Sequence, residues 1–210
     1  MKPEYALILA WPETKCKQAG AWYDGIMETV GVSKNGYYKV GHAAIVLINA
    51  KGEPFYFDFG RYHAPHGNGR VRDVSSDYDL ALKTKINFEN HKPQNIEELM
   101  NELQAKKACH GDGKLEASLV SINFKKAFDG AKKMQNKTFI PYGPFVYKGT
   151  NCSRFVKTVA HKGMSFSLRK VFLNTPLMLT PTPMWNVYIG AKQNNEVYEI
   201  PVYKEEIAIA

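Results

Sequence analysis

The segment GHAAIVLINAKGEPFYFDFG, residues 41–60, constrains the fold more than any other part of the chain. Its first half is apolar at every position from 43 to 48, which is typical of a strand buried on both faces of a sheet. Its second half is another strand-like run, separated from the first by a turn that contains Gly52. We therefore expect a β-hairpin whose first strand is central in its sheet, with His42 at the mouth of that strand.

The length of the turn decides which side chains share a face. If residues 50–52 form a three-residue loop with Gly52 in the left-handed conformation, Asp58 lies diagonally across from His42 on the same face, at about 7–8 Å between backbones. A loop one residue shorter or longer would move Asp58 to the opposite face. Because Asp58 lies between two phenylalanines, its charge needs a partner there, and His42 is the candidate.

The rest of the chain predicts a mixture of strands and helices. We expect strands at 5–10, 80–88 and 117–122, strand-like segments at 185–191 and 196–203, and helices at 18–30, 95–106, 123–135 and from Cys152 onward. A Pro-rich crossing, residues 174–185, precedes the last strands. Because no regular βαβ repeat is present, the pattern predicts an α+β fold with a mainly antiparallel sheet packed against helices. Without a linker or an internal repeat, we expect a single domain over residues 1–210.

Three widely spaced cysteines, Cys16, Cys109 and Cys152, argue against a disulfide framework or a structural zinc site. Only Cys152 has a distinctive setting, in NCSRFVKTVAHK. On one interpretation it is a small hydrophobe on the buried face of a helix. On the other, Thr150 or Asn151 caps the helix, so that Cys152 lies in the first turn, where the helix dipole favours a thiolate.

A cysteine nucleophile needs a base, and His42 is the candidate. A lone histidine at a strand end is more often a hydrogen-bonded core residue. A carboxylate that orients the ring, which the hairpin register offers in Asp58, favours the catalytic interpretation.

A strand that opens GHAAIV, a following strand with an acidic residue and a later NCSRFV helix resemble the circularly permuted NlpC-type members of the papain-like cysteine peptidase superfamily. The stretches FDFGRYHAPHGNGRVRD and YGPFVYKGTNCSRFV look like an uncharacterised bacterial family within that group. The resemblance implies a papain-like fold in which Cys152 is the nucleophile, His42 the general base and Asp58 the residue that orients the histidine. It also implies that Tyr142 lines the active site. Arg154 stands where conventional members carry glycine, which leaves the substrate open.

A Gly-containing loop after the hairpin carries Arg61, Arg70 and Arg72. It is either a basic surface loop or a site where these arginines hold a substrate carboxylate by paired hydrogen bonds. The same loop contains His63 and His66, but no third ligand accompanies them, so we expect no metal and no other cofactor.

The formal net charge of +8 suggests an anionic partner, but the lysines are dispersed over helix faces and no nucleic-acid-binding motif accompanies them. No window reaches the roughly 20 apolar residues of a membrane span, and we expect a soluble, cytoplasmic protein. The resemblance predicts a cysteine peptidase or amidase that cleaves a small peptide, or another amide or ester, through a thioester. A thiol acyltransferase and a catalytically silent domain that binds an anionic ligand are the alternatives.

Overall fold

The computed structural model describes residues 3–18, 20–31, 33–38, 40–165, 181–191 and 197–200. Its centre is a seven-stranded sheet in the order β11-β7-β6-β5-β1-β10-β12, and every neighbouring pair in it is antiparallel. These strands are β1 (Tyr5–Trp11), β5 (His42–Ile48), β6 (Pro54–Gly60), β7 (Asn68–Arg72), β10 (Leu115–Ser121), β11 (Ile140–Pro141) and β12 (Val197–Ile200). The predicted α+β class with a mainly antiparallel sheet is confirmed.

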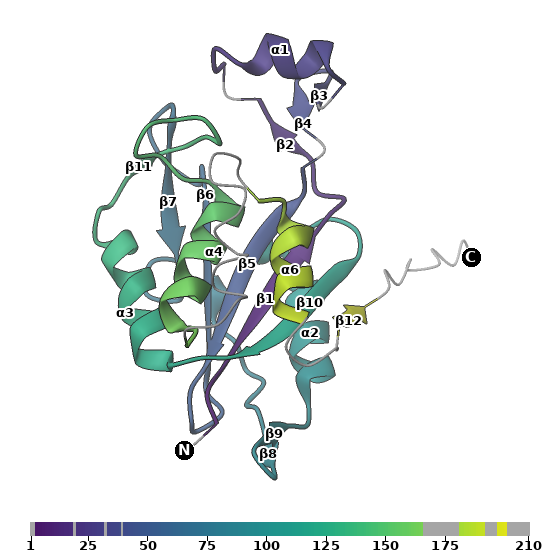
Figure 1. Ribbon diagram of the computed structural model, residues 1–210, viewed down its shortest axis with the longest axis vertical. Coiled ribbons are helices and arrows are strands. Elements are labelled where there is room, and N and C mark those ends of the chain that lie inside the picture. The colour runs from purple at the N-terminus through teal and green to yellow at the C-terminus, as the bar shows by residue number, and fades with distance from the viewer. Residues whose placement is uncertain are drawn as a thin grey trace, which may run out of the picture.

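Helices cover both faces of the sheet (Figure 1). On one face lie α3 (Phe124–Gln135), α4 (Cys152–Gly163) and α6 (Pro183–Ala191); on the other lie α2 (Ile96–Ala105) and the 3₁₀ turns η1 (Tyr78–Leu80) and η2 (Lys107–Cys109). The side chains of β5 alternate between the two cores, with Ala43 and Ile45 beneath α4 and Ala44 and Val46 on the α2 side. Because both faces are covered, every residue of β5 is buried, as the apolar run predicts.

The hairpin has the predicted register. Gly52 adopts a φ of +78°, the Asn49 amide donates to the Glu53 carbonyl at 3.1 Å, and Ala44 pairs with Asp58. Asp58 therefore lies on the face of the sheet that His42 also uses.

Two helix starts follow from their capping residues. The Asn123 side chain accepts a hydrogen bond from the Lys126 amide at 2.9 Å at the start of α3. At α2 the expected cap, Asn95, occupies the capping position, but its side chain instead accepts from the Asn87 amide at 2.9 Å. Asn95 thus connects α2 to the preceding segment.

The strand predicted over 80–88 is wrong. Only β8 (Phe88–Glu89) is a strand, paired with β9 (Lys92–Pro93). The backbone of this segment is satisfied in other ways: the amides of Lys83 and Thr84 donate to the Glu102 carboxylate, each at 2.8 Å, and Ile86 donates to the Gly52 carbonyl at 2.8 Å. Leu80 and Ile86 are still buried in the core, and Leu82 and Phe88 pack against it. The alternation of apolar residues therefore reflects burial and not pairing in a sheet.

The strand-like segment 185–191 is also corrected, because it forms helix α6. Pro183 opens the helix, and the Thr182 hydroxyl accepts from the Trp185 amide at 3.1 Å. A short apolar run fits a buried helix as well as a buried strand. Here the segment packs as a helix over one face of the sheet. The last strand, β12, falls within 196–203. Residues 201–203 and most of the Pro-rich crossing lie outside the described residues.

Residues 12–41 form a small projection between β1 and β5, at the end of the sheet where β5 begins (Figure 1). It contains β2 (Cys16–Lys17), α1 (Asp24–Thr29), β3 (Ser33–Lys34) and β4 (Tyr37–Tyr38), with the strand order β2-β4-β3. The helix expected over 18–30 is thus limited to α1, and Trp22, Ile26 and Val30 are exposed. No helix in the described part of the chain is long and apolar enough to span a membrane.

Candidate active site

Helix α4 begins at Cys152, as the capping pattern predicts. The Asn151 side chain accepts a hydrogen bond from the Arg154 amide at 2.9 Å, which fixes the first turn. Cys152 is only 6% exposed; it packs in the core and also lines a pocket. From the other side, Asn186 of α6 donates to the Ser153 hydroxyl at 2.8 Å and braces the same turn.

His42, the first residue of β5, has an imidazole that interacts with both Cys152 and Asp58. Its Nε2 atom lies 3.6 Å from Asp58 Oδ2 and 3.5 Å from the Tyr62 hydroxyl. The Trp11 ring stacks against the imidazole, with centroids 5.8 Å apart. The imidazole is therefore held by contacts on several sides.

Asp58 is completely buried, and its carboxylate is held by more than the histidine. Arg72, on the neighbouring strand β7, pairs with Asp58 in the sheet register. Its Nε donates to Asp58 Oδ1 at 3.0 Å and its Nη2 donates to Oδ2 at 2.6 Å. The Tyr56 hydroxyl adds a hydrogen bond to Oδ2 at 3.1 Å. A buried charge needs such a set of partners to remain ionised.

The pKa values follow from these contacts. Burial alone would lower the pKa of His42, but the hydrogen bonds and charges of Asp58 and Cys152 outweigh it and raise this pKa to about 9. Burial would raise the pKa of Asp58, yet the hydrogen bonds from His42 and Arg72 hold it below its usual value. At neutral pH the arrangement therefore favours an imidazolium beside a carboxylate.

The other two cysteines differ from Cys152 in their surroundings. Burial, followed by the nearby charge of Cys152, raises the pKa of Cys16 to about 12, and its thiol donates to the Gly41 carbonyl at 3.4 Å. Burial likewise raises the pKa of Cys109 to about 12. Both thiols remain protonated at neutral pH.

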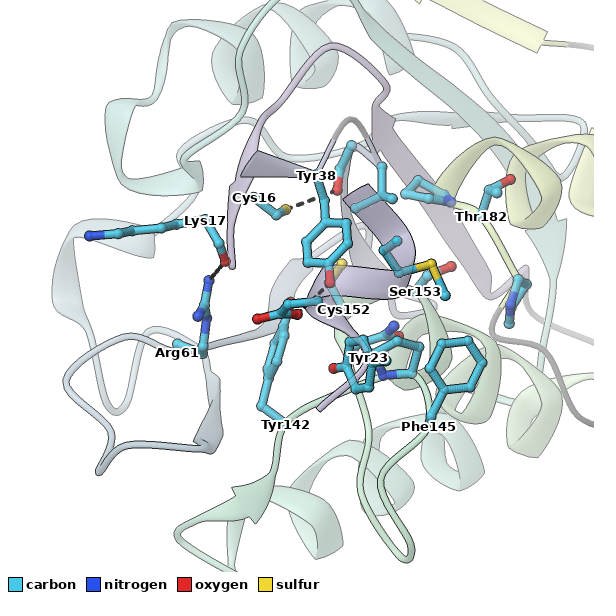
Figure 2. Close-up of a pocket in the computed structure, with 18 residues that line it drawn as sticks. Cys16, Lys17, Tyr23, Tyr38, Arg61, Tyr142, Phe145, Cys152, Ser153 and Thr182 are labelled. Atoms are coloured by element: carbon cyan, nitrogen blue, oxygen red, sulfur yellow. Dashed lines mark hydrogen bonds between the residues drawn. The ribbon is translucent and has the colours of Figure 1, made fainter. Parts of the chain in front are cut away.

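A pocket of about 230 Å³ opens beside Cys152 (Figure 2). The tyrosines Tyr23, Tyr38 and Tyr142 lie around Cys152. Tyr142, which the resemblance places in the active site, lines this pocket and stacks on Phe59 at 5.8 Å between ring centroids. The pocket thus gives a ligand access to the candidate nucleophile.

The three arginines expected to bind a substrate carboxylate are separated by the fold. Arg61 lines the pocket, donates to the Lys17 carbonyl and lies over the Tyr142 ring at 5.3 Å. Arg70 and Arg72 do not line it, and their guanidinium groups are already paired. Arg70 forms two hydrogen bonds of 2.7 Å with Asp77, and Arg72 forms the pair with Asp58. The structure thus corrects the expectation for these two: Arg70 and Arg72 pair with carboxylates of the chain itself.

Sequence reasoning missed two groups of residues at the site. One group comprises Arg72 in its role as partner of Asp58, together with Tyr56 and Tyr62. The sequence held a signal for Arg72, because a charge between two phenylalanines needs a partner and Arg72 lies on β7, the strand that follows β6. The other is the projection 12–41, whose position over the pocket has no local sequence signal.

Arg154, where the resemblance expects glycine, also has a role. It donates to the Gly149 carbonyl at 3.0 Å and to the Pro144 carbonyl, so it ties the pocket loop 141–150 to α4. Within the described ranges, no three His, Cys, Asp or Glu side chains gather into a group that could hold a metal ion.

The fold and site together define an α+β protein in which a thiol, an imidazole and a carboxylate meet beside an apolar pocket. The chain belongs to the family described as type VI secretion system effector TseH-like, whose model matches residues 6–167. The crystal structure of the type VI secretion system effector TseH is similar, with a TM-score of 0.54 and 13% sequence identity over 94% of this chain and 98% of that one. At this identity the similarity concerns the fold. No curated protein matches the chain.

Proposed function

We propose that the protein is a cysteine hydrolase with a papain-like fold of the permuted NlpC type, a single domain that acts as a type VI effector on an amide or ester bond. The observation that carries the proposal is that the His42 imidazole interacts with both Cys152 and Asp58, while Arg72 and Tyr56 hold the carboxylate. A thiol, an imidazole that accepts its proton and a carboxylate that orients the imidazole are the groups that nucleophilic catalysis by a cysteine uses.

The arrangement supports a two-step reaction. In the reactive form the proton of Cys152 resides on His42, so that a thiolate lies beside the imidazolium, and the thiolate adds to the carbonyl carbon of the substrate. The oxyanion that forms lies near the first turn of α4, where the Cys152 backbone N–H and the helix dipole stabilise it. The tetrahedral intermediate collapses to a thioester when the C–N or C–O bond breaks, and the imidazolium gives its proton to the leaving amine or alcohol.

Hydrolysis of the thioester completes the cycle. His42 removes a proton from a water molecule that attacks the thioester, and then returns the proton to the departing thiolate. Asp58 stabilises the imidazolium in both steps without itself accepting a proton. Tyr142 lines the pocket and contacts the substrate. The Arg61 guanidinium uses one nitrogen on the Lys17 carbonyl, and its other donors would bind a carboxylate on a small peptide.

The experiment compares the three cysteines by iodoacetamide labelling near pH 6, with each modified peptide quantified by mass spectrometry. We expect Cys152 to react at least about tenfold faster than Cys16 and Cys109, because the His42 imidazole interacts with Cys152, whereas burial raises the pKa of the other two thiols to about 12. The substitution His42→Ala should remove this advantage, while the control His66→Ala, in the loop after the hairpin, should keep it. Equal and slow labelling of all three cysteines in the wild-type protein would contradict the proposal and favour a binding domain.

A further inference from the structure

The projection 12–41 forms one wall of the pocket at Cys152. The opposite wall is formed by the loop before α4 and by the start of α4 itself (Figure 2). The described residues that line the pocket include Tyr23, Met27, Tyr38 and Val40 from the projection, and Tyr142, Pro144 and Phe145 from the loop. Most of these side chains are aromatic or aliphatic, so the surface next to the nucleophile is suited to an apolar group.

The described residues that line the pocket include three charged ones, Lys17, Asp24 and Arg61. The Lys17 side chain extends away from Cys152 (Figure 2), and the other two have partners within the protein. Asp24 accepts hydrogen bonds from the Ala21 amide at 2.8 Å and from the Tyr38 hydroxyl. Burial, and then Asp24, raises the pKa of Tyr38, so that the phenol remains a donor to this carboxylate. Arg61 donates to the Lys17 carbonyl and lies over the Tyr142 ring. These contacts turn the charges toward the walls.

The two walls of the pocket contact each other directly. The Tyr23 and Phe145 rings meet edge to face, with centroids 5.2 Å apart and an interplanar angle of 78°. Gly143 allows this approach, since a Cβ there would lie 2.7 Å from the Tyr23 hydroxyl. Arg154 anchors the same loop to α4 through the carbonyls of Pro144 and Gly149. The width of the pocket is thereby set by packed aromatic rings and not by charged side chains.

We propose that this pocket binds a ring-sized apolar group of the substrate, next to the carbonyl that Cys152 attacks. The volume of about 230 Å³ suits such a group, because an apolar cavity of about 150 Å³ in another protein admits benzene. Aromatic walls select a compact, flat group over a flexible chain. The proposal rests on the proposed function, since it assigns the substrate class of the same site, and it gives the projection 12–41 the role of a specificity element.

The test uses three haloacetamides with the same reactive group: iodoacetamide, N-benzyl iodoacetamide and N-octyl iodoacetamide. The second-order rate constant for Cys152 with each probe is divided by that of free cysteine with the same probe, and the substituted probes are then compared with iodoacetamide. We expect this normalised rate constant to be about tenfold or more higher for the benzyl probe than for iodoacetamide. The octyl probe should have a smaller increase than the benzyl probe.

Two substitutions place a charge in the pocket: Met27→Asp on α1, and Val40→Asp between β4 and β5. Each should reduce the benzyl preference to nearly that of free cysteine. The matched control is Ile26→Asp, which adds the same charge to the same helix at a position that is 55% exposed and does not line the pocket. It should retain the preference.

The outcomes separate this inference from the proposed function. Fast labelling of Cys152 by iodoacetamide without a benzyl preference would overturn the pocket assignment and leave the hydrolase proposal standing. Labelling of Cys152 as slow as that of Cys16 and Cys109 would overturn the hydrolase proposal itself. A stronger preference for the octyl probe than for the benzyl probe would assign the pocket to an extended chain. A loss of the benzyl preference in Ile26→Asp as large as in Met27→Asp would show that the residues lining the pocket do not produce the preference. Both results contradict the inference.

Discussion

Asp58 is the residue on which the candidate site depends most. It is fully buried between two cations, Arg72 and the protonated form of His42, and Tyr56 also donates to it. Arg72 fixes the orientation of the carboxylate by two hydrogen bonds and keeps it ionised. The ionised carboxylate in turn raises the pKa of His42. At this scale Arg72 acts on the site through Asp58, as a positioning residue.

The substitution Asp58→Asn should lower the rate of iodoacetamide labelling at Cys152 by about tenfold at pH 6–7. The pKa of His42 is raised to about 9, so the wild-type imidazole is protonated throughout this range and supports a thiolate beside it. Without the carboxylate, the imidazolium is less stable and supports the reaction of Cys152 less. Above about pH 9 the wild-type imidazolium also loses its proton, and the two proteins should react alike. The measurement is the full pH profile of labelling.

The matched control for this prediction is Asp77→Asn. Asp77 also forms a two-point pair with an arginine, Arg70, but it does not contact His42. Its loss should leave the pH profile of Cys152 unchanged. If Asp58→Asn gave the wild-type profile while His42→Ala did not, the orienting role would belong to another group, such as the Tyr62 hydroxyl.

At the scale of elements, the turn of the β5–β6 hairpin brings the site together. Gly52 has a φ of +78°, and a Cβ at this position would lie 1.9 Å from the Ile86 carbonyl oxygen. The Gly52 carbonyl accepts a hydrogen bond from Ile86 at 2.8 Å, so the turn is fixed by the segment that packs against it. Since the length of this turn sets the register, it also sets the face on which Asp58 lies.

The substitution Gly52→Ala should destabilise the protein by more than about 2 kcal/mol in urea unfolding, because it adds a backbone clash to the cost of the left-handed conformation. Gly67→Ala is the matched control. Gly67 has nearly the same φ, +76°, but a Cβ at this position would have nothing within 4 Å, so only the conformational cost of about 1–2 kcal/mol remains. Equal losses for the two variants would show that the contact with Ile86 does not restrict the turn.

At the scale of the whole molecule, the net charge of +8 is the excess of cations over carboxylates, so ion pairs within the chain leave it unchanged but determine which cations are engaged. Several cations are paired with nearby carboxylates, among them Arg70 with Asp77 and Lys132 with Asp73. Arg72 is buried against Asp58. Arg70 and Arg72 are thus engaged by carboxylates of the chain itself and add little to a basic surface after the hairpin.

We expect an unrelated DNA duplex to bind only weakly and only at low salt. Affinity measured by titration of a labelled duplex should be in the non-specific range of about 10⁻⁴–10⁻⁶ M at physiological salt. It should be unchanged in Arg70→Ala, because that arginine is already engaged by Asp77. Tight binding at physiological salt that is lost in Arg70→Ala would contradict this expectation and place a nucleic-acid site on the loop after the hairpin.

The parts of the structure that the sequence determined by itself are those that depend on neighbouring residues. The register of β5 and β6 follows once residues 50–52 form a three-residue turn with Gly52, because turn length and the two-residue period of a strand fix which side chains share a face. The start of α4 at Cys152 followed from Asn151 in the same way, since a cap acts within one turn of a helix.

Only the tertiary structure decided the features that depend on distant segments. The apolar run 185–191 became α6 because it packs as a helix over the sheet, and the alternating run 80–88 found its hydrogen-bond partners in Glu102 and the hairpin turn instead of in a neighbouring strand. Arg72 was drawn to Asp58 because a carboxylate buried in the core needs a cation, a requirement that no local pattern assigns to a particular residue. The position of the projection 12–41 beside Cys152 was likewise decided by packing between segments more than a hundred residues apart.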